Sequence, residues 1–276
     1  MNFKIVADSS ADMIALNGCD FVSVPLKINT TEKEYIDNES LDVVSMLTDL
    51  ASYNGKSHSS CPNSQEYLSA FGDAENIFCV TITSGLSGSY NSASVAAQEY
   101  INSYPKRHVH VIDSLSTGPE NALLIQKLCE LIQSGLNFDE IKQEIIKYHE
   151  HTRLIFALES MHNLSRNGRV SPIVAKVAGI LGIRVIGRAS DVGTLEIIEK
   201  SRGAKSAIAD IVKNMISDGY KGGKVRIHHA NNPSSADMLK EKILESMPAA
   251  EIEIYEARGL CSFYAEQGGL LVGFEI

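Results

Sequence analysis

Short runs of β-branched residues alternate with longer amphipathic stretches along the first half of the chain. The runs that predict strands lie at 3–7, 21–25, 77–82 and 109–113. Leucine, isoleucine and alanine recur at three-to-four spacing elsewhere, which predicts helices over 41–52, 64–73, 89–103, 118–134 and 138–150. This alternation is typical of an α/β fold. The nearly continuous apolar runs at 77–82 and 109–113 predict parallel strands covered by helices on both faces.

The second half of the chain contains similar elements in a less regular order. We expect a strand over 153–160, a polar turn over 161–172, a segment rich in Gly, Ala and Ile over 173–190, a strand leading into a helix over 194–219, a strand over 223–232, a helix over 233–247 and two strands in the tail. We therefore predict an N-terminal α/β domain with a parallel sheet over 1–155. A second, C-terminal α/β domain follows over 156–276.

Small polar side chains follow three of the predicted strands. The segments are "ADSSAD" (7–12), "TSGLSGSYNSA" (83–93) and "IDSLSTG" (112–118). N-capping of the next helix accounts for each segment taken alone. Because ligands of parallel sheets bind beyond the carboxyl ends of the strands, the three together favour a site for an anionic or hydrogen-bonding group at helix N-termini. We interpret Asp8, Ser9 and Asp113 as supporting or capping residues.

Composition and charge narrow the classes of function. The chain has 276 residues, of which 44% are hydrophobic, and a formal net charge of −9. This charge argues against a nucleic-acid partner. No apolar run reaches the roughly 18 residues of a membrane span, and no signal peptide is recognisable, so we expect a cytoplasmic protein. The cysteines have no paired spacing, which predicts reduced thiols and neither a disulfide framework nor a zinc site; they are Cys19, Cys61, Cys79, Cys129 and Cys261.

The main alternative function is that of a small-carboxylate or ester hydrolase or transferase that uses Ser87 in the same cleft beyond the strand ends. "GLSGS" (85–89) differs by one residue from a nucleophile elbow, because Ser89 stands where glycine is required. The histidines and Asp113 that would complete a triad have no spacing that links them to Ser87. We find neither a metal-ligand spacing nor a phosphate-loop motif, and we expect no cofactor.

Six segments resemble, in order and approximate spacing, the DegV family of bacterial fatty-acid-binding proteins. They are the first two segments quoted above together with "SSCPNSQEYLSAF" (59–71), "VIDS" (111–114), "LSRNGRVS" (164–171) and "KSRGAKSAI" (200–208). The resemblance covers essentially the whole chain. It implies a mixed sheet in the C-terminal α/β domain and a ligand cleft between the two domains, with one long-chain fatty acid in an apolar tunnel there. It also implies a monomer without catalytic activity and a role in phospholipid metabolism. A separate fatty acid kinase subunit would receive the carboxylate and make the acyl phosphate.

The resemblance also assigns residues to the site. Ser59 and Ser87 match the carboxyl binders of the family, and we place their sequence neighbours Ser60, Gly85 and Gly88 in the same fatty-acid-binding site. Two arginines, Arg169 and Arg202, match family positions for which we expect a head-group or partner-facing role. The small and branched residues of 173–190 suit a tunnel wall and ordinary helix-to-sheet packing equally well.

The C-terminal segment departs from the family pattern. The family usually has a "THxGPG"-like segment whose histidine completes the carboxyl site, whereas this chain reads "SFYAEQGG" (262–269). Tyr264 stands at the histidine position, and its hydroxyl can donate to a carboxylate. We place Tyr264 and Gln267 in the fatty-acid site. Glu266 either points to solvent or repels a bound carboxylate.

Overall fold

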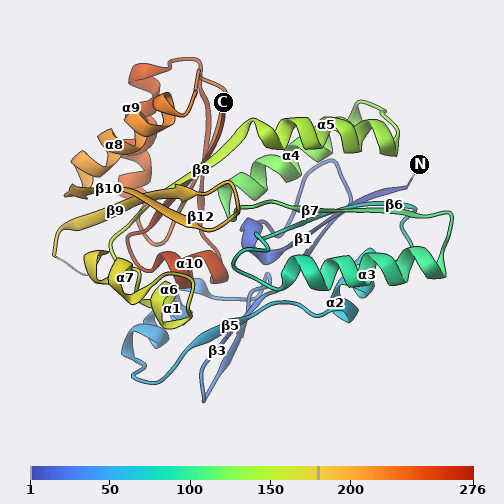
Figure 1. Ribbon diagram of the computed structural model, residues 1–276, viewed down its shortest axis with the longest axis horizontal. Helices are drawn as coiled ribbons and strands as arrows, with labels where there is room; N and C mark the ends of the chain where they lie inside the picture. Colours follow the sequence, from blue (N-terminus) through green and yellow to red (C-terminus); the bar gives the residue numbers. More distant parts are fainter. Residues whose placement is uncertain (1, 179–180) are drawn as a thin grey trace.

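A four-stranded parallel sheet organises the first half of the chain in the computed structural model, which describes residues 2–178 and 181–276. Its strand order is β2 (Phe21–Val24), β1 (Phe3–Asp8), β6 (Asn76–Thr81) and β7 (His108–Asp113). Helices α2 (Ser64–Phe71) and α3 (Ser89–Ser103) cover one face, and α4 (Pro119–Gln133) and α5 (Phe138–Glu150) cover the other (Figure 1). The predicted parallel strands between two helical layers are confirmed.

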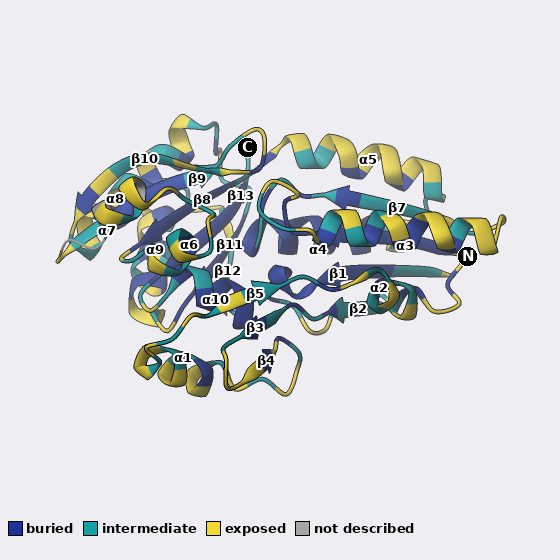
Figure 2. Cartoon of the chain, turned by 60° about the horizontal axis from the view of Figure 1, so that its bottom comes forward, coloured by how far each residue is buried: buried dark blue, intermediate teal, exposed yellow. Residues whose placement is uncertain are grey.

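Strand β6 shows why the sheet strands lack an alternating pattern. All six of its residues are buried. Ile77 and Cys79 pack against α2 and α3, whereas Phe78 and Val80 pack against α4 and α5. A strand covered on both faces has a nearly continuous apolar run, which in β6 extends over residues 77–80 between the buried polar ends Asn76 and Thr81. Figure 2 shows this buried sheet between helices that expose only their outer faces.

A six-stranded mixed sheet organises the second half, as predicted. Its order is β10 (Leu195–Arg202), β9 (Ile183–Ala189), β8 (Thr152–Leu158), β13 (Leu270–Glu275), β11 (Lys224–His229) and β12 (Glu251–Glu256). The pair β11–β12 is parallel and the other pairs are antiparallel. Helices α8 (Ala204–Ser217) and α9 (Pro233–Ser246) cover one face. The division into two domains at residue 155 stays a prediction, and β8, which contains that residue, lies wholly in the six-stranded sheet.

Several short elements differ from the expectations. The expected polar turn at 161–172 contains helix α6 (His162–Arg166), and 173–190 forms most of α7 (Pro172–Ala178) and all of β9, with residues 179–180 outside the described chain. A small antiparallel sheet has the order β4 (Glu34–Ile36), β3 (Lys27–Asn29) and β5 (His58–Ser60), with α1 (Val43–Ser52) nearby in the sequence. Helix α10 (Gly259–Ala265) lies between β12 and β13.

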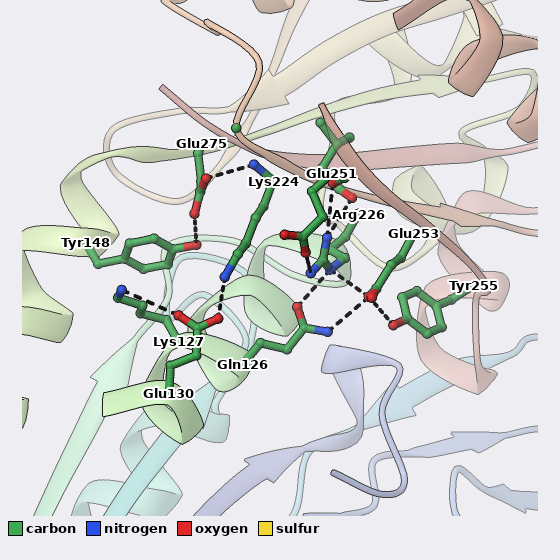
Figure 3. Close-up of polar contacts among 12 residues, drawn as sticks. Gln126, Lys127, Glu130, Tyr148, Lys224, Arg226, Glu251, Glu253, Tyr255 and Glu275 are labelled. Carbon is green, nitrogen blue, oxygen red and sulfur yellow. Dashed lines mark hydrogen bonds and ion pairs between the residues drawn. The ribbon is translucent and has the colours of Figure 1, made fainter. Parts of the chain in front are cut away.

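Helix α4 joins the two larger sheets. Its apolar side packs on the parallel sheet, and it also contacts β11 and β13. Figure 3 shows the polar part of this junction, where the Arg226 Nε donates to Gln126 of α4 over 2.7 Å. Glu251 and Glu253 lie 3.0 Å from the same buried guanidinium. The two carboxylates and the amide offset part of the desolvation cost of this buried guanidinium.

A disulfide joins Cys19 and Cys129, so the prediction that all the cysteines are reduced is wrong for this pair. Cys19 precedes β2, Cys129 lies on α4, and their Cα atoms are 5.9 Å apart. The two positions are 110 residues apart in the sequence, so no local spacing could have revealed them. Cys61, Cys79 and Cys261 are free. Over the described residues, no helix has the length and apolar character needed to cross a membrane.

Candidate functional site

An apolar pocket lies between the carboxyl-end loops of the parallel sheet and the inner face of the six-stranded sheet. It contains about 690 Å³ of space between atoms, including the part that opens to solvent. Five polar or charged residues line it: Ser59, Ser87, Thr117, Arg169 and Tyr264. The rest of the lining is Leu26, Ile82, Leu86, Leu154, Phe156, Leu158, Leu164, Leu195, Leu260, Cys261, Ala265 and Leu271. An apolar site with a few polar groups suits a mostly apolar ligand.

Strand β8 supplies much of the apolar wall through its alternation. Leu154, Phe156 and Leu158 face the pocket, while Ile155 and Ala157 pack in the core under α8 and α9. The sequence analysis missed these wall residues because both faces of β8 are apolar, which hides the period of two. The run of alternate large side chains at 154, 156 and 158 was the available signal.

Tyr264 and Ser59 form the centre of the polar part of the pocket. Their hydroxyl oxygens are 2.7 Å apart. The guanidinium carbon of Arg169 lies 5.6 Å from the centre of the Tyr264 ring, and the Arg169 Nε donates to the carbonyl of Leu86 over 3.3 Å. Burial raises the pKa of the Tyr264 hydroxyl above its usual range. Tyr264 therefore stays a neutral hydrogen-bond donor near neutral pH.

Ser87 lies at the start of α3, in the loop that follows β6. Its hydroxyl donates to the Ser89 hydroxyl over 3.2 Å and accepts from the Ser89 amide over 3.3 Å. The N-cap position itself is Gly88, which provides no side-chain cap. Ser87 thus combines a capping contact with a position on the pocket wall, so the two interpretations of this loop are compatible.

Two carboxylates hold the strand-end loops in place. Buried Asp8 accepts from the amide of Ile82 over 2.9 Å and from the hydroxyl of Ser10 over 2.5 Å. Asp113 accepts from the amides of Ser84 and Leu115 over 2.9 and 3.2 Å. Both therefore act on the loops next to the pocket, consistent with their expected supporting role.

The other predicted site residues lie outside this pocket. Ser60 follows the pocket residue Ser59 on β5, and successive side chains of a strand point to opposite faces. Its hydroxyl accepts from the side-chain amide of Asn29 over 3.2 Å. A Cβ on Gly88 would lie 3.1 Å from the Cys61 sulfur. Arg202 is exposed at the end of β10 and is not among the residues that line the pocket. The functional roles of these residues stay predictions.

Gly85, Glu266 and Gln267 contact other parts of the structure. A Cβ on Gly85 would lie 2.9 Å from the Val192 carbonyl oxygen, so its close approach is to the turn between β9 and β10. Gln267 lines a separate surface hollow beside α1 and α6. The Glu266 carboxylate accepts from the amide of Asn163 over 2.9 Å. Glu266 is therefore directed at α6, which removes the expected conflict with a ligand carboxylate in the pocket.

Among the described residues of 173–190, none lines the pocket. Val185 and Ile186 of β9 pack in the two cores on either side of the sheet. Residues 179–180 and the side chains of 174, 177 and 178 lie outside the described part of the chain. The described residues thus favour ordinary packing over a tunnel wall for this segment.

The groups of the alternative catalytic site are not assembled within the described chain. The Ser87 hydroxyl donates to Ser89, and none of its hydrogen bonds there involves a histidine. Buried His228 is paired through Nδ1 with Asp12 over 2.7 Å, and Asp113 is occupied by loop amides. In this arrangement Ser87 is better suited to hydrogen bonding than to nucleophilic attack.

Comparison with known proteins adds a family relationship. A family model described as "Uncharacterised protein, DegV family" matches residues 2–275. A DegV domain-containing protein of Streptococcus pneumoniae is 44% identical over 280 residues, which cover 100% of both chains. The fatty acid kinase (Fak) B3 protein of S. pneumoniae, solved loaded with linoleic acid, matches with a TM-score of 0.98 and 44% identity over 100% of both chains. A DegV family protein of Eubacterium eligens loaded with heptadecanoic acid matches with a TM-score of 0.97 and 44% identity over 99% of both chains.

Proposed function

Because the chain belongs to the DegV family, we propose that it binds a long-chain fatty acid in the pocket between its sheets and presents the carboxyl group to a fatty acid kinase. The observation that carries this proposal is the pocket itself, an apolar space with one cluster of polar side chains. Two proteins of the same fold at 44% identity were solved with fatty acids bound.

Burial of the acyl chain supplies most of the affinity. A chain of about 14 methylenes at ~0.8 kcal/mol each gives ~11 kcal/mol before association and ordering costs. A hydrogen bond to the carboxylate contributes ~1.5–3 kcal/mol. The leucine-rich wall therefore holds the ligand, and the polar cluster determines which end is presented.

The polar cluster is suited to a carboxylate. Ser59, Ser87 and Tyr264 offer hydroxyl donors, and Arg169 brings a positive charge beside the Tyr264 ring. When a carboxylate enters, Tyr264 and Ser59 exchange the hydrogen bond between them for bonds to its oxygens. The chain contributes binding and orientation in this scheme, and the kinase contributes phosphoryl transfer.

The test uses a variant that fills the pocket. Leu195→Trp places an indole in the space for the acyl chain, whereas Val192→Trp changes an exposed residue at the turn of the same hairpin, where Val192 is 70% exposed. We expect wild type and Val192→Trp to bind one palmitic acid per chain in native mass spectrometry after delipidation, and Leu195→Trp to bind at least tenfold more weakly. Equal binding by Leu195→Trp, or no binding by wild type, would contradict the proposal.

A further inference from the structure

Asp37 is a buried carboxylate at the end of β4 that bonds to the first turn of α10. One oxygen accepts from the amide of Gly259 and the other from the amide of Leu260, each over 2.9 Å. The carboxylate approaches so closely that a Cβ on Gly259 would lie 2.7 Å from its carbon. The amide of Asp37 itself donates to the carbonyl of Leu26, a pocket residue, over 2.9 Å. Both ends of this residue are thus fixed beside the pocket.

This contact connects two of the elements that contribute to the polar cluster. The small sheet contributes Ser59 on β5, and α10 contributes Tyr264. Asp37 holds the beginning of α10 to that sheet, and the Ser59–Tyr264 hydrogen bond joins the same two elements near the end of the helix. Phe263 packs with Ile28 and Met46 between these two contacts. The position of the Tyr264 hydroxyl relative to Ser59 therefore depends on the Asp37 anchor.

We propose that Asp37 is a positioning residue for the ligand head group, acting through α10 to keep the Tyr264 hydroxyl directed at the site of the carboxylate. The inference rests on the proposed fatty-acid function and adds a residue that does not line the pocket. It also makes head-group recognition dependent on the ionisation of this one buried carboxyl group.

The charged and titratable groups around Asp37 come from three elements. Arg258, just before α10, has its Nε 3.8 Å from the carboxylate. Asp12 follows the first strand, accepts from the Arg258 amide over 2.8 Å and pairs with His228 of β11. Cys261 of α10 directly follows Leu260, whose amide donates to Asp37. Burial and the negative charge of Asp12 raise the pKa of Asp37 to about 6, against the opposing effect of the two helix amides.

Protonation of Asp37 has different effects on the stability of the fold and on the anchor of α10. Because the folded pKa of Asp37 lies above its unfolded value, this group by itself favours the folded state most at low pH, and the contribution is lost as the pH rises through about 6. Protonation, however, turns one of the two accepting oxygens into a hydroxyl, which is a donor and a much weaker acceptor for a helix amide. A fall in pH through 6 therefore loosens the anchor of α10 without loss of stability from this group.

The experiment compares two ligands that share a tail. Palmitic acid and 1-hexadecanol have the same acyl length, so the ratio of their dissociation constants reports on the head group alone. We expect Asp37→Asn to reduce the preference for palmitic acid about tenfold at pH 7.5 while binding 1-hexadecanol within twofold of wild type. Glu34→Gln, which changes an exposed acid on the same strand, should keep the wild-type ratio.

Two further measurements separate positioning from general damage. If Asp37 acts through Tyr264, the variant Asp37→Asn/Tyr264→Phe should have the same ratio as Tyr264→Phe alone. In wild type, the preference for palmitic acid over 1-hexadecanol should fall between pH 7 and 5, with a titration step near pH 6 that Asp37→Asn lacks. The wild-type titration also provides a test if the variant does not fold. An unchanged ratio in Asp37→Asn, or additive effects in the double variant, would overturn the inference. Failure of wild type to bind palmitic acid would instead overturn the proposed function.

Discussion

The hydroxyl oxygens of Tyr264 and Ser59 lie 2.7 Å apart, although 205 residues separate them in the sequence. Ser59 belongs to a three-residue strand of the small sheet and Tyr264 to a short helix between two strands of the large sheet. The pair therefore forms only when these two parts of the chain have reached their final positions. Its hydrogen bond reports on the assembly of the site as well as on its chemistry.

Removal of the Tyr264 hydroxyl tests the energetic value of this pair. Tyr264→Phe leaves the Ser59 hydroxyl without its partner in a partly buried place, and we expect the free energy of unfolding to fall by about 1 kcal/mol. Affinity for 1-hexadecanol, which reports on the acyl tail without a carboxylate, should change less than tenfold, because the apolar wall is intact. Urea unfolding and a lipid-binding titration measure the two effects. Tyr104→Phe, at an exposed tyrosine of the loop after α3, should change neither quantity.

Gly85→Ala tests the contact between the loop after β6 and the turn of the β9–β10 hairpin. The new Cβ would lie 2.9 Å from the Val192 carbonyl oxygen and 3.0 Å from that of Gly193. Backbone atoms must move to relieve this clash, which costs about 1–3 kcal/mol. The Thr83 hydroxyl should then lose its bond to Gly193, now 2.8 Å.

We therefore expect Gly85→Ala to lower the unfolding free energy and to release bound fatty acid severalfold faster, because Leu86 and Leu195 line the pocket on the two sides of this contact. A stopped-flow displacement assay measures the release rate. Ser84→Ala alters the exposed neighbour and should release the ligand at the wild-type rate. Unchanged release from Gly85→Ala would show that the hairpin contact does not limit exit.

Cys19→Ser tests the contribution of the disulfide. The bond closes a loop of about 110 residues and anchors α4 to the segment before β2. Its loss should lower the unfolding free energy by about 2–4 kcal/mol relative to the oxidised wild type. Thermal melts with and without dithiothreitol measure the same difference without mutation. Cys61→Ser, at a free cysteine, should melt like wild type under both conditions; equal melting of oxidised and reduced wild type would contradict the prediction.

Long periodic elements were predictable from the sequence, whereas short ones were not. Helices α3 and α5 begin and end at the predicted residues, and α5 also has a capping box formed by Asn137 and Glu140. The strands of the small sheet have three residues each, too few to establish a period of two. Helix α10 buries nearly all of its residues, so it has no polar face from which a period of 3.6 could be recognised.

The residues of the polar cluster were predictable only where a sequence motif includes them. The resemblance to a known family indicated Ser59, Ser87, Arg169 and Tyr264, all of which line the pocket. Asp37 acts on the site through contacts more than 220 residues away in the sequence, and Thr117 reaches the pocket from the start of α4. Such relationships arise from tertiary placement, which neither composition nor local spacing records.

Leu154 of β8 and Leu260 of α10 border the same pocket from two different parts of the structure. An acyl chain in that space would serve as an additional core side chain that is not covalently attached. The cargo would then belong to the folding unit, because whatever binds the native state alone stabilises it. Folding stability and fatty-acid binding are then thermodynamically linked. Heat or denaturant should release the fatty acid in the same cooperative step that unfolds the protein.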